Sequence, residues 1–304
     1  MSSQSEALQT TEEVTLQALL LCQAGIGTLA NILLLVHNSS PVVPGSRVRP
    51  VQVIVTHVAV ANALILLITA FPNKVMFFVP RKPKSNLKCK IEYFIRQVAR
   101  STNMCSTCVL STYQFLTLVP CPCGRVMLRG RAPSILSYSC YSCWFFSVLN
   151  NVYIPLKVSG SQSTANGTDN SKWVCSTPGF SVGMVILPFA HHSVFISIMV
   201  WTSVSMVLLL HRHKKRVQHL HTPNQDQRIH PETRAVHTIL MLVVTFVSFY
   251  ALGSICNLFH ISFVGSPLWL RHVGEVLIAG FPTVSPLLLI FRDRKNPCSA
   301  LFNC

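Results

Sequence analysis

The segment that decides the fold is CKIEYFIRQVARSTNMCSTCVLSTYQFLTL, residues 89–118. It contains neither Pro nor Gly, and as a helix rising ~1.5 Å per residue it is long enough to cross a bilayer at a tilt. Glu92, Arg96 and Arg100 recur at every fourth position, so the three charges share one face. A charge at that depth costs about 2.5–3.5 kcal/mol on insertion scales unless it faces protein or water. We therefore expect a central helix whose charged face lines a polar cavity. The alternative is a Glu92–Arg96 ion pair near the outer interface, with both arginines reaching toward that interface.

The composition of the whole chain is typical of a membrane protein. Of its 304 residues, 50% are hydrophobic and only 11% are charged, whereas an ordinary soluble domain has about 25% charged residues. The formal net charge is +16, but the bases lie in short loops between apolar runs, which is the pattern of membrane topology. No nucleic-acid-binding motif accompanies them, so we expect no nucleic-acid partner. Most of the twelve cysteines lie in apolar runs or basic loops, which argues against a disulfide framework.

Seven apolar segments are each long enough to form a transmembrane helix. Together they predict an all-α membrane protein, a seven-transmembrane-helix bundle that occupies residues 14–291. An extracellular tail (1–13) precedes the bundle and a cytoplasmic tail (292–304) follows it. The first tail lacks the basic region and cleavage site of a signal peptide, so the first span is expected to act as its own targeting signal. The segments are about 14–37, 51–79 with an interruption at Pro72, 89–118, 134–156, 180–210, 235–263 and 268–291.

The distribution of Lys and Arg predicts the orientation of this bundle. Arg47 and Arg49 follow the first span, and further basic clusters follow the third, fifth and seventh spans. Because cytoplasmic loops are enriched in Lys and Arg, the N-terminus is expected outside and the C-terminus in the cytoplasm. The loop between the second and third spans, which is also basic, departs from this rule.

Two features of the predicted outer surface agree with this orientation. Cys89 opens the third span and Cys175 lies in the loop between the fourth and fifth spans, so both face the oxidising side. We expect a Cys89–Cys175 disulfide that holds this loop over the bundle; the alternative is two free thiols. Asn166 begins an Asn-Gly-Thr glycosylation sequon in the same loop, whereas the Asn38 sequon falls inside.

Several stretches resemble the vomeronasal type-1 receptors, a pheromone-receptor family of G-protein-coupled receptors, and they occur in the family's order across nearly the whole chain. The acidic N-terminus, the outer loops and the extreme C-terminus match poorly. The matching stretches are THVAVANALIL (56–66), RQVARSTNMCSTCVLSTYQ (96–114), HRHKKRVQHLH (211–221), PETRA (231–235), TFVSFYAL (245–252) and FPTVSP (281–286).

The resemblance implies that a small pheromone or odorant binds among the outer helix halves and shifts the bundle toward a state that engages a heterotrimeric, inhibitory-class G protein. Asn31 resembles the first-helix asparagine of rhodopsin-like receptors. Tyr113-Gln114-Phe115 stands where those receptors have Asp-Arg-Tyr, so the ionic latch made by that arginine is absent. FPTVSP replaces Asn-Pro-x-x-Tyr, and the sixth span lacks a mid-span Pro. These departures leave the activation switch undefined.

The candidate ligand site combines charged, polar and apolar groups. Arg96 and Arg100 supply charge-assisted donors for an anionic ligand group; alternatively, Glu275 in the seventh span neutralises them. Met104 offers an adaptable apolar wall or belongs to the core. The candidate histidines, His191, His192 and His260, titrate near neutral pH and tune binding, or they only form a hydrogen bond with a neighbouring helix. The full set of candidate ligand-binding residues is Glu92, Arg96, Arg100, Met104, His191, His192, Asn257, His260 and Glu275.

At the predicted cytoplasmic end, the stretch HRHKKRVQHLH (211–221) forms a basic juxtamembrane segment that suits contact with anionic lipids and with a docked G protein. Its histidines alternate and so do not share a helical face, and we expect neither a metal nor a cofactor. No catalytic motif or inward carboxylate pair is present, so we expect no enzyme. Two alternatives are another seven-helix chemosensory receptor, such as a bitter-taste type, and a small transporter or channel. The predicted coupling residues are Tyr113, Gln114, Arg212, Lys214, Lys215, Arg216 and Arg234.

Overall fold

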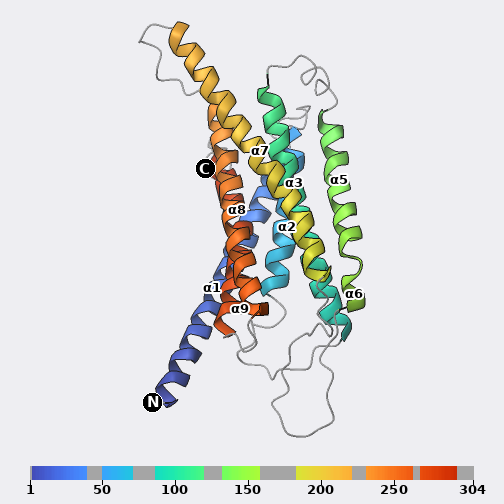
Figure 1. Cartoon of the computed structure of the whole chain (residues 1–304), viewed down its shortest axis with the longest axis vertical. Helices are drawn as coiled ribbons and strands as arrows, with labels where there is room; N and C mark the ends of the chain where they lie inside the picture. Colours follow the sequence, from blue (N-terminus) through green and yellow to red (C-terminus); the bar gives the residue numbers. More distant parts are fainter. Residues whose placement is uncertain are drawn as a thin grey trace, which may run out of the picture.

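The computed structural model describes the chain in seven segments, residues 2–39, 50–70, 86–119, 132–157, 183–220, 231–262 and 268–292. These segments contain seven long helices and the short helix α6, and no strand lies within them. The long helices pack into one bundle, in which α1 begins at the lower end and α9 ends toward the upper end (Figure 1). The helices are α1 (Ser2–Ser39), α2 (Pro50–Ala70), α3 (Asn86–Leu118), α5 (Ala132–Asn151), α6 (Ile154–Lys157), α7 (Gly183–Leu220), α8 (Pro231–Ser262) and α9 (Leu268–Arg292).

The predicted helical segments are all present, with corrections at their ends. α1 begins at Ser2, well before the predicted first span, and α7 continues to Leu220, through nearly all of the basic stretch 211–221. α2 ends at Ala70, two residues before Pro72, and the rest of the predicted second span, residues 71–79, lies outside the described residues. The fourth span was predicted to reach residue 156, but α5 ends at Asn151. Pro155 explains this end, because it has no N–H to bond the carbonyl four residues earlier.

Helix α3 lies at the centre of the bundle, as its charged face predicts. It packs against α2, α5 and α7, and also touches α6 and α8. The polar side chains Ser101, Thr102 and Asn103 are buried, each at most 3% exposed. Further along, Thr107 and Ser111 donate to the carbonyls four residues earlier, at 2.8 and 3.0 Å. Such bonds satisfy hydroxyls within their own helix, so a polar helix can be buried among others.

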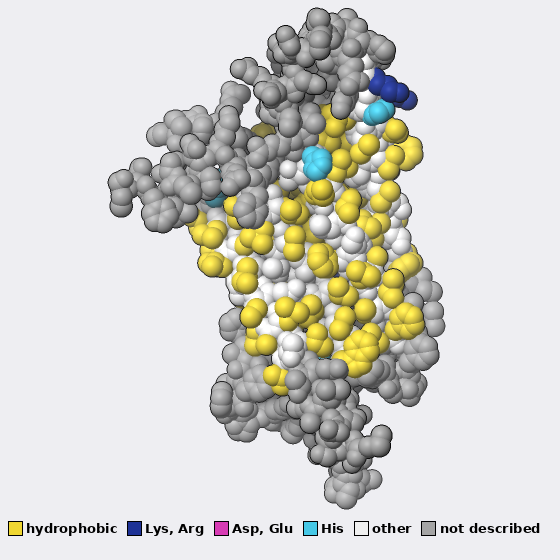
Figure 2. Space-filling view, turned by 90° about the vertical axis from the view of Figure 1, so that its left-hand side faces the viewer, with side chains coloured by type: hydrophobic (Ala, Val, Ile, Leu, Met, Phe, Trp, Pro, Cys, Tyr) yellow, Lys and Arg dark blue, Asp and Glu magenta, His cyan; other side chains and the backbone are white. Residues whose placement is uncertain are grey.

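Five of the described helices are long and apolar enough to cross a membrane, and α3 and α5 are not among them. In α3 the reason is the charge of its first half and the Ser and Thr residues of its second half. In α5 it is the frequency of Ser, Tyr and Asn. The side of the bundle drawn in Figure 2 carries mostly hydrophobic side chains across its middle, with Lys, Arg and His toward one end. A seven-transmembrane bundle fits this arrangement, because α3 lies at its centre and α5 packs against α3 and α2.

Helix α9 contains Pro282 and Pro286, and a side chain from α1 compensates for the second. Pro286 has no N–H, so the carbonyl of Pro282 lacks its usual helical donor. Asn31 Nδ2 donates to this carbonyl at 3.0 Å. Asn62 Nδ2 of α2 donates to Asn31 Oδ1 at 3.2 Å and to Ser285 Oγ at 2.9 Å. One buried polar network therefore joins α1, α2 and α9.

Candidate functional site

The charged face of α3 leads to Arg100, which lies between α3 and α8. Its guanidinium sits over the ring of Tyr250, 5.3 Å from the ring centroid. Within the described residues, no carboxylate lies within ion-pair distance of Arg100. A cation over an aromatic face gains from the ring quadrupole, but this contact does not neutralise the charge. Arg100 is therefore a partly buried cation without a protein anion in the described part of the chain.

Tyr250 connects Arg100 to three other helices. Its hydroxyl forms a hydrogen bond with Nδ1 of His192 on α7. The His192 side chain is buried, with 7% of the residue exposed. Its ring is parallel to that of Phe246, with the centroids 6.1 Å apart. Phe246 in turn meets Phe281 of α9 edge to face at 4.7 Å. An aromatic row therefore runs from the arginine on α3 through α8 to the proline-containing part of α9.

A small cavity of about 30 Å³, the central cavity, lies beside this row and is bounded by α2, α3, α8 and α9. Its polar lining consists of Arg100, Asn103 and Tyr250, and the remaining lining is apolar. Asn103 Oδ1 is buried and has no hydrogen-bond partner, and such a group is costly to leave unsatisfied. The cavity holds about one water molecule, so a larger ligand requires the aromatic side chains to move.

A disulfide links α3 to α5 within the bundle. Cys105 and Cys143 are bonded, with their Cα atoms 5.7 Å apart. Cys108 and Cys140, on the same two helices, are buried free thiols. The sequence does not predict this bond, because both cysteines lie within helices rather than on the predicted outer surface. The disulfide fixes the position of α5 against the central helix.

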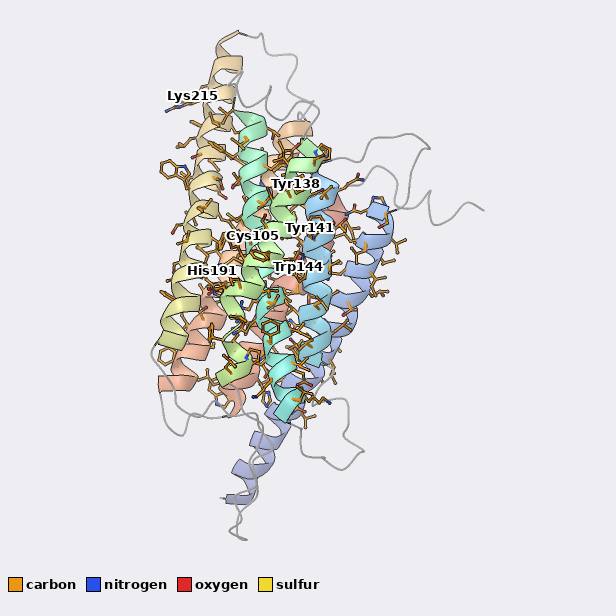
Figure 3. All side chains as sticks on the ribbon, turned by 90° about the vertical axis from the view of Figure 1, so that its right-hand side faces the viewer. Cys105, Tyr138, Tyr141, Trp144, His191 and Lys215 are labelled. Carbon is orange, nitrogen blue, oxygen red and sulfur yellow. A yellow bond between two sulfur atoms is a disulfide. The ribbon has the colours of Figure 1, made fainter. Side chains whose placement is uncertain are left out.

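The opposite half of α3 ends among core side chains. Gln114 is 7% exposed, and Tyr113 packs against the main hydrophobic core together with residues of α7 and α8. Beyond this level α7 continues as a helix with basic side chains. Arg212 and Lys215 are exposed, and Lys215 projects away from the bundle at the upper end of α7 (Figure 3).

Comparison with known proteins identifies the family to which this chain belongs. The sequence profile of the vomeronasal organ pheromone receptor family matches residues 14–298. The chain belongs to the vomeronasal type-1 receptor family. It is 32% identical to human vomeronasal type-1 receptor 4 over 281 residues, which cover 90% of this chain and 93% of that receptor. Identity to human vomeronasal type-1 receptor 2 is also 32%, over 92% of this chain and 72% of that one.

A more distant relative is the zebrafish olfactory receptor class A-like protein 1, 27% identical over 90% of this chain and 88% of its own length. Membership makes this vomeronasal-type receptor a pheromone-type chemosensory G-protein-coupled receptor and a multi-pass protein of the plasma membrane. The family is one of receptors, not of enzymes.

The structure separates the three charges predicted on α3 of this vomeronasal-type receptor. Glu92 lies 3.9 Å from Lys88 Nζ, and Arg96 lies over Tyr93 of its own helix, 5.4 Å from the ring centroid. The alternative Glu92–Arg96 ion pair is therefore not the arrangement found. Arg100 alone among the three lines the central cavity. Their predicted roles in ligand binding stay predictions.

The other candidate ligand residues have different surroundings. Glu275 Oε2 is 3.8 Å from Nδ1 of His272 on its own helix, α9. Met104 is fully buried in the hydrophobic core. His192 bonds a neighbouring helix, which was the simpler of its two predicted roles. The remaining predicted residues lie outside the side chains that the structure describes; they are Cys89, Asn166, Cys175, Lys214, Arg216, Arg234, Asn257 and His260.

Sequence reasoning missed Tyr250, Asn103 and Asn62, all polar residues within apolar helices. Tyr250 lies in TFVSFYAL and Asn62 in THVAVANALIL, two stretches that carried the family resemblance. A polar side chain at membrane depth is the signal that identifies all three, because such groups need a partner inside the bundle. The sequence does not reveal which helix supplies that partner.

Proposed function

We propose that this receptor binds its pheromone or odorant in the half of the bundle around Arg100 and signals to an inhibitory-class heterotrimeric G protein at the other end. In this proposal the N-terminus is extracellular and the C-terminus cytoplasmic, as the distribution of Lys and Arg favours. The main support is Arg100, a partly buried cation that no carboxylate of the described residues neutralises.

A cation in this position favours a ligand with an anionic or strongly polar group. A charge-assisted hydrogen bond to guanidinium is worth roughly twice a neutral one. Asn103 Oδ1 and His192 Nε2, both buried without a partner, offer further polar contacts. The aromatic row and the apolar cavity lining suit the body of the ligand. The expected ligand is therefore an apolar molecule with one anionic group, such as a conjugated steroid.

Tyr250 is the proposed link between binding and signalling. The central cavity is too small for such a ligand, so the anionic group has to displace the Tyr250 ring from Arg100. Tyr250 is hydrogen-bonded to His192 and stacked on Phe246, which in turn touches Phe281. When the Tyr250 ring moves, these contacts move with it. The movement thereby shifts α8 relative to α7 and α9. A ligand shifts the equilibrium only by its difference in affinity for the two arrangements.

The proposed G-protein surface is the end where α3 finishes and α7 extends outward. Arg212 and Lys215 are exposed there, while Gln114 is buried against the core. Basic side chains near a cytoplasmic surface also attract anionic lipids, at about 1 kcal/mol each. Because Gln114 has no charge, it cannot form the ionic latch that an arginine makes at this point in rhodopsin-like receptors.

Arg100→Ala tests the binding proposal. We expect the potency of a steroid sulfate agonist to fall about tenfold to a hundredfold, because one charge-assisted bond contributes about 1.5–3 kcal/mol. The potency of an unconjugated steroid agonist should change less than about threefold. Ligand-dependent nucleotide exchange on the G protein, normalised to receptor at the cell surface, measures both values.

Arg96→Ala is the matched control, since Arg96 lies on the same helix but does not line the central cavity. Arg100→Lys keeps the charge and should retain more sulfate potency than Arg100→Ala. Equal losses for the sulfate and the unconjugated steroid would assign Arg100 a structural role and remove the main support for the site.

A further inference from the structure

A groove with a volume of about 490 Å³ opens between α5 and α7, on the opposite side of α3 from the central cavity beside Arg100. Both helices pack on α3, but they make little contact with each other. The Cys105–Cys143 disulfide lies in the groove, and Phe146, Leu149 and Phe195 supply apolar walls. Figure 3 shows Cys105 and His191 at this side of the bundle. The volume is within the range of small-molecule sites, ~300–1,000 Å³.

Two polar atoms in this apolar groove have no partner. Asn150 Nδ2 and His191 Nδ1 are both buried without a hydrogen bond, and both residues line the groove. The His191 ring is held edge to face by Phe195, with the centroids 4.9 Å apart. An amide donor and an imidazole nitrogen together match a hydroxyl group, which both accepts and donates a hydrogen bond. Leaving them unsatisfied is unfavourable in an apolar environment.

The occupant of the groove has to come from the membrane, because the rim is part of the apolar outer face. Phe145 and Phe146 are 65% and 58% exposed, and Val194 on the facing helix is 58% exposed. The groove follows α5 from Cys143 to Asn150, about 10 Å at ~1.5 Å per residue, and reaches Tyr153 just beyond the end of this helix. Its polar atoms lie near the end of α5 and its apolar walls extend toward the middle. A matching molecule has a polar group near the interface and a rigid apolar body of about the same length as the groove.

We propose that this groove binds a membrane sterol, whose hydroxyl accepts from Asn150 Nδ2 and bonds His191 Nδ1 while its rings lie along Phe146 and Phe195. The disulfide joins α3 and α5, two walls of the groove, and so fixes their spacing. No residue that lines the groove also lines the Arg100 cavity. The proposal is therefore independent of the proposed pheromone site.

Photolabelling of the purified full-length receptor in lipid nanodiscs tests the proposal. A photoreactive cholesterol analogue with a free hydroxyl should label peptides that contain residues 143–153 and 191–195. Excess cholesterol should compete, and its methyl ether should compete about threefold to tenfold less well, because it lacks the hydroxyl proton. This comparison uses the unmodified chain, so it does not depend on how any variant folds.

Asn150→Leu and His191→Phe should each lower the labelling of these peptides about threefold to tenfold. Ser142→Leu, an exposed position on α5 outside the groove, should leave it unchanged. Arg100→Ala should also leave it unchanged, which separates this site from the pheromone site. Labelling that appears elsewhere, that cholesterol and its ether reduce equally, or that a steroid agonist reduces when cholesterol does not would overturn the proposal.

Discussion

Among single residues, Asn31 stabilises a helix to which it does not belong. Proline at position 286 leaves the Pro282 carbonyl without its helical donor, and the amide of Asn31 supplies one at 3.0 Å. The same amide oxygen accepts from Asn62. Both asparagines are at most 1% exposed, so water cannot replace these bonds. A single side chain therefore helps to hold α1, α2 and α9 together.

Asn31→Leu should lower the stability of the purified receptor by about 1–2 kcal/mol, because the substitution keeps a similar branched shape but leaves buried partners on two helices unsatisfied. The measurement is thermal unfolding in a fixed detergent. Ile32→Ala, at a position that is 47% exposed on the same helix, is the control and should have a smaller effect. Equal shifts for the two variants would mean that the network does not contribute.

The Cys105–Cys143 disulfide also affects stability at the residue scale. It closes a loop of 38 residues, and bonds of this kind typically contribute about 2–4 kcal/mol. Cys105→Ser and Cys143→Ser should therefore lower the unfolding temperature equally, and the double variant should be no less stable than either one. Cys140→Ser, which removes a buried free thiol of α5, should leave the bond intact. Peptide mass analysis before and after reduction detects the bond, and finding both thiols alkylated without reduction would contradict the assignment.

The sequence predicted some of these residues but not their partners. Asn31 was identified by its resemblance to a known first-helix asparagine, and Arg100 by its charge at membrane depth. Tyr250, which stacks under Arg100, was not identified, because an aromatic residue in an apolar helix looks like ordinary core. The partner of Cys105 was equally hidden among twelve cysteines, since a pairing depends on how helices face each other rather than on spacing.

At the scale of helices, local sequence patterns predicted which segments form helices better than they predicted where each helix ends. Apolar runs separated by basic loops correctly predicted all seven long helices in the described segments. The error at the end of α5 came from counting apolar residues and overlooking Pro155, which removes one helical donor. The central place of α3 was predictable, because its charges exclude a lipid-facing position. The neighbours of α3 were not, because they depend on packing between distant segments.

Helix α1 approaches α9 closely at Gly27. A Cβ placed there would lie 2.7 Å from a side-chain carbon of Leu66 and 3.1 Å from the Cα of Thr283, whereas a Cβ at Gly25 would meet nothing within 4 Å. Gly27→Ala should therefore lower stability by about 1–3 kcal/mol through overpacking. Gly25→Ala is the matched control on the same helix and should be neutral or slightly stabilising. The two unfolding temperatures should differ, and identical values would refute the close approach.

The whole molecule combines an apolar outer belt with a polar interior. The middle of the visible face carries mostly hydrophobic side chains, with bases near one end (Figure 2). Inside, Arg100, the asparagine network and the disulfide hold neighbouring helices together. Membrane bundles depend on such contacts, because lipid is as apolar as the side chains it surrounds and provides no hydrophobic drive between helices. The class of fold could thus be read from composition, whereas the contacts that make it specific could not.

In the proposed topology, seven passes place the two chain ends on opposite sides of the membrane, with the N-terminus outside as the basic loops favour. An epitope tag at the N-terminus should bind antibody on intact cells, while a tag at the C-terminus should bind only after the membrane is permeabilised. Asn166→Gln should remove a glycan and raise gel mobility, whereas Asn38→Gln should change nothing, because that sequon is predicted to be cytoplasmic. Both tags reacting on intact cells, or a glycan at Asn38, would rule out this topology. A glycan at Asn38 would also place the Arg100 half of α3 on the cytoplasmic side, away from an arriving pheromone.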